Sequence, residues 1–284
     1  METIYVSSAL ESRYLSVFCR LRTKLQLAGV HFRVLPSTNI WLRDWMPIEV
    51  GKHFVKFDYA KNFDRYPQLK ICDSCWKHLV DVRHSPIVLD GGNVVRLNDR
   101  VLMTDIVFEH NQGVERTILL NELESLLEAE IIILPIEPGD TLGHADGIAR
   151  WIDQDTVFIN DYPKAAADPC MKEYSRALRK VLLHEGIEAI PFPNAYHRRP
   201  RMSEGEFRQA YPGGDEWNSG YGYSINFLQV ANAIIYPVFG IPEDQCAECR
   251  LRQAFPGADL DTIGCSDLSM EGGLLNCITV NYRS

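Results

Sequence analysis

The chain has 284 residues, 46% of them hydrophobic, which is enough to bury a sizeable core as one large domain or two smaller ones. With 29 lysines and arginines against 38 aspartates and glutamates, the formal net charge of −9 argues against a nucleic-acid partner. We find neither an apolar run of membrane-spanning length nor a signal peptide, so we expect a cytoplasmic protein with no membrane partner.

Helices predicted from the spacing of apolar residues alternate with short strands along the chain. A helix at residues 10–27 leads into a strand at 31–35, and a shorter helix at 74–80 leads into a strand at 86–89. The later pairs of helix and strand lie at residues 118–127 and 131–134, 174–184 and 188–192, and 246–255 and 259–263.

A degenerate repeat accompanies these pairs. Each copy runs from a corner with glycine or aspartate through an apolar run, a polar hairpin turn and a second apolar run. Four complete copies lie at residues 43–57, 90–103, 145–159 and 223–236, and the fifth is the segment around Cys277. A unit of roughly 50 residues that cannot bury its own faces favours radial packing about an axis. The corners would then converge on one central site.

One stretch, residues 194–222, breaks the repeat. It is polar, aromatic and rich in glycine, and a long irregular insertion of this kind is either an active-site lid or a simple surface excursion. If it is a lid, its charged residues could recognise the tail of a substrate. Arginines at 198, 199 and 201 suit a carboxylate, whereas Asp215 and Glu216 suit an amine.

The eight cysteines are expected to be reduced thiols, because the chain is long and carries no secretion signal. Two Cys-x-x-Cys pairs, Cys72 with Cys75 and Cys246 with Cys249, could in principle share a zinc ion. The pairs lie far apart in sequence and the second falls in a helical pattern. We therefore favour unrelated thiols and expect no metal.

Five residues at the corners of the repeat suit chemistry on a cationic carbon. Cys277 follows a glycine pair and could attack as a thiolate, and His144 could protonate the departing nitrogen and then activate water. Asp44 and Asp146 could bind a guanidinium from the sides, because its N–H groups form a planar fork. Asp90 could hold His144 or accept a further guanidinium N–H.

Each of these residues also has an ordinary structural explanation. Taken singly, Cys277 is a core thiol, His144 a satisfied buried polar group and Asp44 a partner for its neighbour Arg43. Asp90 and Asp146 would be turn residues. The functional interpretation depends on all five falling at equivalent corners of one repeat.

The motifs at these corners resemble those of a known family. Trp41-Leu-Arg-Asp44 is similar to Trp-x-Arg-Asp, Gly143-His-Ala-Asp146 matches Gly-His-x-Asp, and residues 272–279 are similar to Gly-Gly-x-x-x-Cys-Ile-Thr. Residues 223–227 look like the stretch that precedes the last structural repeat in that family. The chain thus resembles the agmatine deiminases, which belong with the bacterial peptidylarginine deiminases to the guanidine-modifying superfamily. The resemblance implies a five-bladed α/β-propeller (pentein) as a single domain over residues 1–284.

By this resemblance Cys277 is the nucleophile, His144 the acid and base, and Asp44 and Asp146 bind the guanidinium. Asp90 stands where the deiminases carry glutamate, so its oxygens reach roughly 1.5 Å less far. The site would then close inward, use a water bridge or take a different substrate.

Further substrate contacts are expected from Trp41, Asn93 and Gly273. The resemblance implies no cofactor and suggests a homo-oligomer.

The leading hypothesis is hydrolytic deimination of a small cationic guanidino compound through a thiouronium intermediate. Agmatine, which would give N-carbamoylputrescine and ammonia, is the first candidate, followed by arginine and peptidyl-arginine. Amidino transfer to an amine on the same scaffold and an inactive guanidine-binding protein are the alternatives.

Overall fold

The computed structural model describes residues 2–60, 70–140, 142–162, 169–195, 206, 209 and 220–283. The chain forms two compact units. Unit 1 contains Met1–Arg43, Asn62–Cys75 and Phe192–Ser284, and unit 2 contains Asp44–Lys61 and Trp76–Pro191. A single domain over residues 1–284 remains a prediction. So does a lid at 194–222, most of which lies outside the described residues, including all five charged residues considered for substrate recognition.

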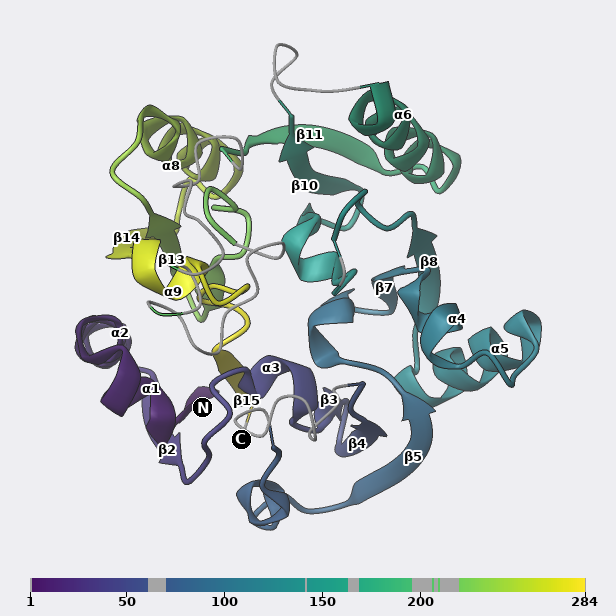
Figure 1. Cartoon of the computed structure of the whole chain (residues 1–284), viewed down its shortest axis with the longest axis horizontal. Coiled ribbons are helices and arrows are strands. Elements are labelled where there is room, and N and C mark those ends of the chain that lie inside the picture. The colour runs from purple at the N-terminus through teal and green to yellow at the C-terminus, as the bar shows by residue number, and fades with distance from the viewer. Residues whose placement is uncertain are drawn as a thin grey trace. The chain divides into compact units, whose positions relative to one another are not determined.

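Unit 2 contains three small sheets, and most of their strands are labelled in Figure 1. Across the first two, the strands are β3 (Ile48–Val50), β4 (His53–Asp58) and β5 (Val82–Val88), then β6 (Val95–Leu97), β7 (Arg100–Thr104) and β8 (Glu130–Leu134). In both, the middle strand pairs antiparallel with the strand before it and parallel with the strand after it. A hairpin supplies the antiparallel pair, whereas the parallel partner needs a longer crossover. The third sheet joins β9 (Ala149–Asp153), β10 (Thr156–Asp161) and β11 (Glu188–Pro193).

Unit 1 contains two sheets of the same mixed kind. β13 (Ala233–Val238) pairs antiparallel with β12 (Leu228–Val230) and parallel with β14 (Asp259–Gly264). β1 (Glu2–Ser7) likewise pairs antiparallel with β15 (Thr279–Arg283) and parallel with β2 (His31–Leu35). Strands from the two ends of the sequence therefore share one sheet, and the five sheets correspond to the five predicted copies of the repeat.

The predicted hairpin turns lie where the sequence places them. Gly51, Asn98 and Ala231 have φ of 58°, 53° and 48° between β3 and β4, β6 and β7, and β12 and β13. Positive φ in a short loop matches the right-handed twist of the flanking strands. Glycine and asparagine adopt this conformation readily, whereas Ala231 does so against its preference.

The helices of unit 2 are α4 (Ile106–His110), α5 (Arg116–Leu127) and α6 (Pro169–His184). At the start of α5, the Glu115 carboxylate accepts hydrogen bonds from the backbone N–H groups of Thr117 and Ile118. The helix then buries Leu119, Leu123 and Leu127 at four-residue spacing in the core of the unit. Such spacing is typical of one apolar helix face.

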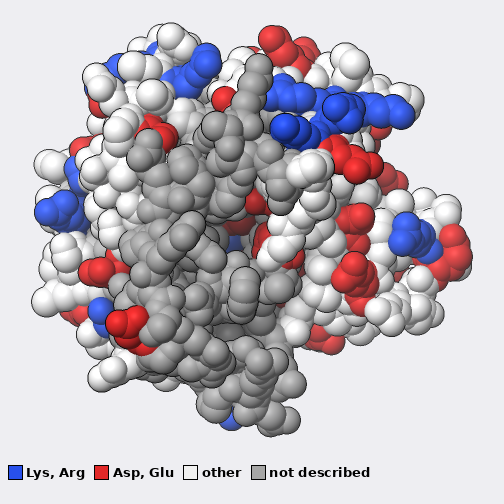
Figure 2. All heavy atoms as spheres, turned by 45° about the horizontal axis from the view of Figure 1, so that its top comes forward, with Lys and Arg blue, Asp and Glu red and all other residues white. Residues whose placement is uncertain are grey.

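The α6 helix is amphipathic. It buries Tyr174, Leu178 and Leu182 and exposes Lys172 and Arg176 on another face. Figure 2 shows basic side chains gathered over this helix, near the top of the view. The formal net charge of the whole chain, these residues included, is −9.

The first helix of unit 1 differs from the prediction. Instead of one helix at 10–27 there are two, α1 (Ser8–Arg13) and α2 (Leu15–Leu27), and Tyr14 between them has non-helical φ and ψ of −132° and 54°. The Tyr14 hydroxyl donates a hydrogen bond to Glu271, which is distant in sequence. This contact accompanies the break that local periodicity did not reveal.

A second difference concerns the helix predicted at 74–80, which is only a 3₁₀ turn, η2 (Asp73–Trp76). Val80 is 81% exposed, so the segment buries no continuous apolar face that could stabilise a longer helix. Among the described residues, unit 1 also contains α8 (Pro242–Ala254) and α9 (Ser266–Ser269), which adjoin β14, and the residues of α3 (Leu42–Trp45) are divided between the two units.

Across the part of the chain that the structure describes, none of the helices is both long and apolar enough to traverse a bilayer.

Candidate active site

Two corners of unit 2 repeat the same backbone conformation. Asp90 precedes the 3₁₀ turn η3 (Gly91–Asn93) with φ −79° and ψ 135°. His144 precedes the turn η4 (Ala145–Gly147) with φ −81° and ψ 133°. The two side chains therefore occupy equivalent positions in consecutive copies of the repeat, 54 residues apart.

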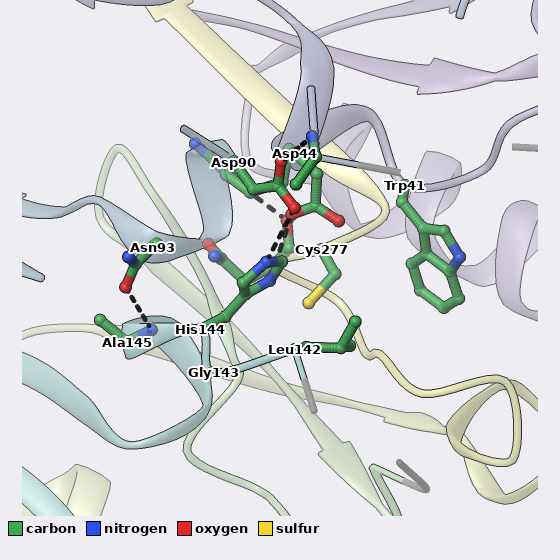
Figure 3. Close-up of polar contacts among 12 residues, drawn as sticks. Trp41, Asp44, Asp90, Asn93, Leu142, Gly143, His144, Ala145 and Cys277 are labelled. Atoms are coloured by element: carbon green, nitrogen blue, oxygen red, sulfur yellow. Dashed lines mark hydrogen bonds and ion pairs between the residues drawn. The ribbon is translucent and has the colours of Figure 1, made fainter. Parts of the chain in front are cut away.

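The imidazole of His144 lies between two carboxylates (Figure 3). Its Nε2 is 3.2 Å from Oδ2 of Asp90, and its Nδ1 is 3.6 Å from Oδ1 of Asp44. All three side chains are buried, and Asp146 of η4 is 2% exposed. The residues thus form a buried carboxylate–imidazole cluster: Asp44, Asp90, His144 and Asp146.

The charges of this cluster favour a protonated imidazole. Burial by itself lowers the pKa of His144, but the charge of Asp44, the hydrogen bond with Asp90 and the charges of Asp90 and Asp146 outweigh it. Together they raise the pKa from 6.5 to about 9. At neutral pH His144 is therefore an imidazolium with a proton to give.

Asp90 reaches the imidazole directly despite its short side chain. Its second oxygen, Oδ1, accepts a hydrogen bond from the backbone N–H of Ala60 at 3.0 Å. Each carboxylate oxygen thus has a defined partner, and this orients the group toward His144. With aspartate in place of glutamate, a water bridge was one of the expected ways to span the site. The direct contact between Asp90 and His144 needs no such bridge.

Gly92 makes room for the cluster. A Cβ atom added at this position would lie 2.6 Å from Nδ1 of His144 and 2.7 Å from Oδ1 of Asp44. Real Cβ atoms do not approach other heavy atoms so closely, so any larger residue must displace the imidazole or the carboxylate. The glycine is required here by close approach.

The backbone on both sides of His144 is held by two buried polar residues, Asn93 and Thr104. Asn93 Oδ1 accepts hydrogen bonds from the N–H of Ala145 at 3.2 Å and of Thr104 at 2.8 Å (Figure 3 draws the first). The Thr104 hydroxyl donates to the carbonyl oxygen of Gly143. Since the peptide groups before and after His144 are both bonded, its side chain projects from a fixed position.

Cys277 lies in unit 1, 8% exposed, in the core cluster that also contains Leu274, Leu275 and Ile278. Its Sγ donates to Oδ1 of Asn226 at 3.4 Å, and the same oxygen accepts from the backbone N–H of Asn276 at 3.1 Å. The thiol of Cys277 and the backbone N–H of Asn276 thus share one acceptor oxygen on the Asn226 side chain.

Trp41 and Gly273 also lie in unit 1. A Cβ added at Gly273 would be 2.5 Å from Cζ3 of Trp41, so the indole ring lies directly on the glycine. Next to Trp41 in sequence, Arg43 donates its backbone N–H to the Cys277 carbonyl oxygen at 3.1 Å. These contacts join the Trp-x-Arg-Asp and Gly-Gly-x-x-x-Cys segments within the unit.

The predicted site residues therefore fall into two groups. Unit 2 brings together Asp44, Asp90, His144 and Asp146, with Asn93 bonded to the backbone beside them, and unit 1 brings together Trp41, Gly273 and Cys277. Asp44 belongs to the one-turn helix α3 and Asp146 to a 3₁₀ turn, so both lie in short turns that precede a strand.

Sequence reasoning gave no role to three residues that the structure connects with the site. Thr104 ends β7, and nothing in its neighbourhood marks it as more than a strand residue. Gly92 follows the candidate turn residue Asp90, and nothing in the sequence marks its close approach to His144. Asn226 lies in the 223–227 motif, which was the one available signal for its contact with Cys277.

A search of the described residues finds no group of three or more His, Cys, Asp or Glu side chains that could hold a metal ion. The two Cys-x-x-Cys pairs, all four residues of which are described, form no such group.

Comparison with known proteins places these residues in a family. The model of the Porphyromonas-type peptidyl-arginine deiminase family matches residues 3–282. The chain belongs to this family. Agmatine deiminases are among its relatives: the enzyme of Stutzerimonas stutzeri is 26% identical over 259 residues, which are 84% of this chain.

Solved structures with the same fold include agmatine deiminases. That of C. jejuni has a TM-score of 0.73 at 17% identity, with 99% of this chain and 92% of the other covered. That of Enterococcus faecalis has a TM-score of 0.72 at 15% identity and covers 98% and 92%. These matches confirm the predicted α/β fold of the pentein superfamily, with its five small mixed sheets.

The chain spans only part of the length of the curated relatives it matches. The matched region spans 63% of the S. stutzeri enzyme and 58% of another curated relative.

Proposed function

We propose that the chain is a cysteine-dependent deiminase, which hydrolyses a guanidino compound to a ureido compound and ammonia. Membership of the deiminase family supports this reaction class. The observation that carries the proposal is the buried imidazole of His144, which lies between Asp90 and Asp44 with its pKa raised to about 9. A buried imidazolium in that position is suited to protonating a departing nitrogen.

The same cluster suits a cationic substrate. Three carboxylates surround one imidazolium, so negative charge is in excess, and a bound guanidinium would offset it. We assign guanidinium binding to Asp44 and Asp146, because carboxylates pair with the planar N–H fork of a guanidinium. Trp41 would lie against the substrate as an apolar wall.

In the first half of the reaction, the Cys277 thiolate attacks the central guanidinium carbon. The tetrahedral intermediate then expels one nitrogen, which takes a proton from His144 and leaves as ammonia. A thiouronium remains on Cys277, and His144 becomes neutral. The positive charge of the arriving guanidinium favours the thiolate form of the nucleophile.

In the second half, neutral His144 takes a proton from water while the water oxygen attacks the thiouronium carbon. Collapse of the second tetrahedral intermediate breaks the carbon–sulfur bond, its hydroxyl proton passes to solvent, and the ureido product is released. The cycle ends with the Cys277 thiolate and protonated His144, so one water is consumed for each ammonia released. No cofactor enters the proposed cycle.

Agmatine is the substrate we propose first. Its support is the agmatine deiminase of S. stutzeri, together with the net acidity of this chain. Arginine and peptidyl-arginine differ from agmatine in the groups beyond the guanidinium, so a direct comparison separates them.

The test is ammonia and urea-type product release from agmatine, arginine and a blocked arginine peptide, with and without an acceptor amine. The proposal predicts turnover by the wild type and its loss in Cys277→Ser. A matched control is Cys265→Ser, because Cys265 is a second cysteine of the same core cluster, 1% exposed, outside the proposed chemistry. If Cys277→Ser is as active as an active Cys265→Ser control, Cys277 is not the nucleophile. An amidino product formed only with the acceptor would show transfer instead of hydrolysis.

A further inference from the structure

The Cys72–Cys75 pair forms a closed turn in unit 1. Cys72 immediately precedes η2, and Cys75 lies within it. The backbone N–H of Cys75 donates to the carbonyl oxygen of Cys72 at 2.9 Å. Residues that close a turn over three positions have Cα atoms within about 7 Å, which overlaps the separation found across disulfides. The two thiols also interact, since each shifts the pKa of the other. A disulfide can therefore close with little movement of the backbone.

The two thiols differ in exposure. Cys72 is partly exposed, whereas Cys75 is 1% exposed and its Sγ lies 3.9 Å from the Pro36 carbonyl oxygen. A small reagent in solution thus meets Cys72 first. Cys75 is shielded from solvent but lies in contact with Cys72.

Their acidities differ in the same sense. Hydrogen bonds from the Ser74 hydroxyl, from Cys75 and from the backbone N–H groups of Ser74 and Cys75 lower the pKa of Cys72, although burial acts against them. Burial first, and then the neighbouring Cys72, raises the pKa of Cys75 to about 12. An accessible thiol that ionises easily, next to a buried thiol that does not, is the arrangement of attacking and resolving cysteines.

The other Cys-x-x-Cys pair lacks the difference in exposure. Cys246 and Cys249 lie on the regular helix α8, and both are exposed. The two pairs share one spacing in the sequence, so the contrast between them comes from local structure. The helical pair is a control built into the chain.

We propose that Cys72 and Cys75 are a redox-active dithiol, which exchanges with low-molecular-weight disulfides and closes to an intramolecular disulfide. The proposal is independent of the deiminase chemistry, since neither residue belongs to the carboxylate–imidazole cluster or to the Cys277 corner.

The exchange has two steps. The Cys72 thiolate attacks one sulfur of a small disulfide, forms a mixed disulfide and releases the first small thiol. Cys75 then loses its proton and attacks the Cys72 sulfur, which releases the second small thiol and leaves the Cys72–Cys75 bond. Two protein thiols are oxidised, and one small disulfide is reduced to two thiols.

The experiment equilibrates the full chain in glutathione mixtures from reduced to oxidised, then quenches with acid, alkylates under denaturing conditions and digests with trypsin. Residues 71–77 form one tryptic peptide with both cysteines. We expect this peptide to lose both alkylations together in mixtures that leave Cys246 and Cys249 alkylated. If residues 72 and 75 stay alkylated, or oxidise no more readily than the helical pair, the proposal is wrong.

Two variants separate the roles of the thiols. Cys75→Ser should stop at a stable glutathione adduct on Cys72, whereas Cys72→Ser should leave Cys75 unmodified. Ser74→Ala, an exposed substitution with little risk to folding, should slow alkylation of Cys72 by iodoacetamide several-fold near neutral pH. An unchanged rate in Ser74→Ala, or the same adduct on both single-cysteine variants, would contradict the assigned roles.

Discussion

The His144 corner of unit 2 and the Cys277 corner of unit 1 follow similar sequence outlines but have different surroundings. His144 is bounded by carboxylates and its backbone is held by buried polar residues. Cys277 lies among apolar side chains, with an amide oxygen as the partner of its sulfur. The carboxylates raise the pKa of His144 and so favour its charged form, whereas the sulfur of Cys277 is buried among apolar groups. The repeat thus determines the backbone, and the side chains around it determine the chemistry.

The strongest way to break this comparison is to remove the charged group. His144→Gln should lower kcat about 10²- to 10⁴-fold, because the leaving nitrogen and the attacking water lose their acid and base. The measurement is steady-state ammonia release beside the rate of Cys277 alkylation, which checks that the other corner still forms. Activity within a few-fold of wild type would place the acid–base group elsewhere.

The charge on His144 should also appear in the pH dependence of stability. Its pKa is raised above the ordinary 6.5 to about 9 in the folded chain, so its contribution is complete below about pH 6.5 and is lost as pH rises through 9. The free energy of unfolding should therefore fall over this range by an amount on the order of 3 kcal/mol.

Urea unfolding of wild type and His144→Gln between pH 6 and 10 measures this contribution. The part of the pH dependence due to His144 is the difference between the two curves. Parallel curves would mean that folding does not raise the pKa of His144.

The steric basis of the unit 2 corner can be tested at Gly92. Gly92→Ala places a methyl group on His144 and Asp44, and we expect a loss of about 1–3 kcal/mol in stability together with a lower kcat. Gly147→Ala is the matched control, since a Cβ there meets nothing within 4 Å. Equal effects of the two substitutions on kcat would show that the close approach at Gly92 does not matter.

The smallest expected effect concerns the bonds that hold the His144 backbone. Thr104→Val removes the hydroxyl bonded to the Gly143 carbonyl and should cost about 1–2 kcal/mol of stability. Thr104→Val should also lower kcat, whereas Thr104→Ser keeps the hydroxyl and should retain most of the wild-type kcat. If valine and serine variants have the same pH–rate profile, Thr104 supports the fold without positioning His144.

The sequence predicted the five copies of the repeat and most of their strands, since these depend on local periodicity and turn residues. It also singled out the residues at the corners, although for each residue taken alone an ordinary structural explanation was as good as the functional one. The failures are local patterns overruled by distant contacts or exposure. Tyr14 breaks the first helix where its hydroxyl meets Glu271, 257 residues away, and residues 77–80 find no apolar surface to cover.

By itself, the sequence determined the repeat, the positions of the hairpin turns and the types of functional group at each corner. These follow from neighbours along the chain, where spacing and backbone preference act directly. Only the tertiary structure decided that Asp90 contacts His144, that Asn93 and Thr104 hold its backbone, and that Cys72 differs from Cys246. Such pairings depend on which atoms approach within a few ångströms after folding, and the spacing of residues along a chain does not contain that distance.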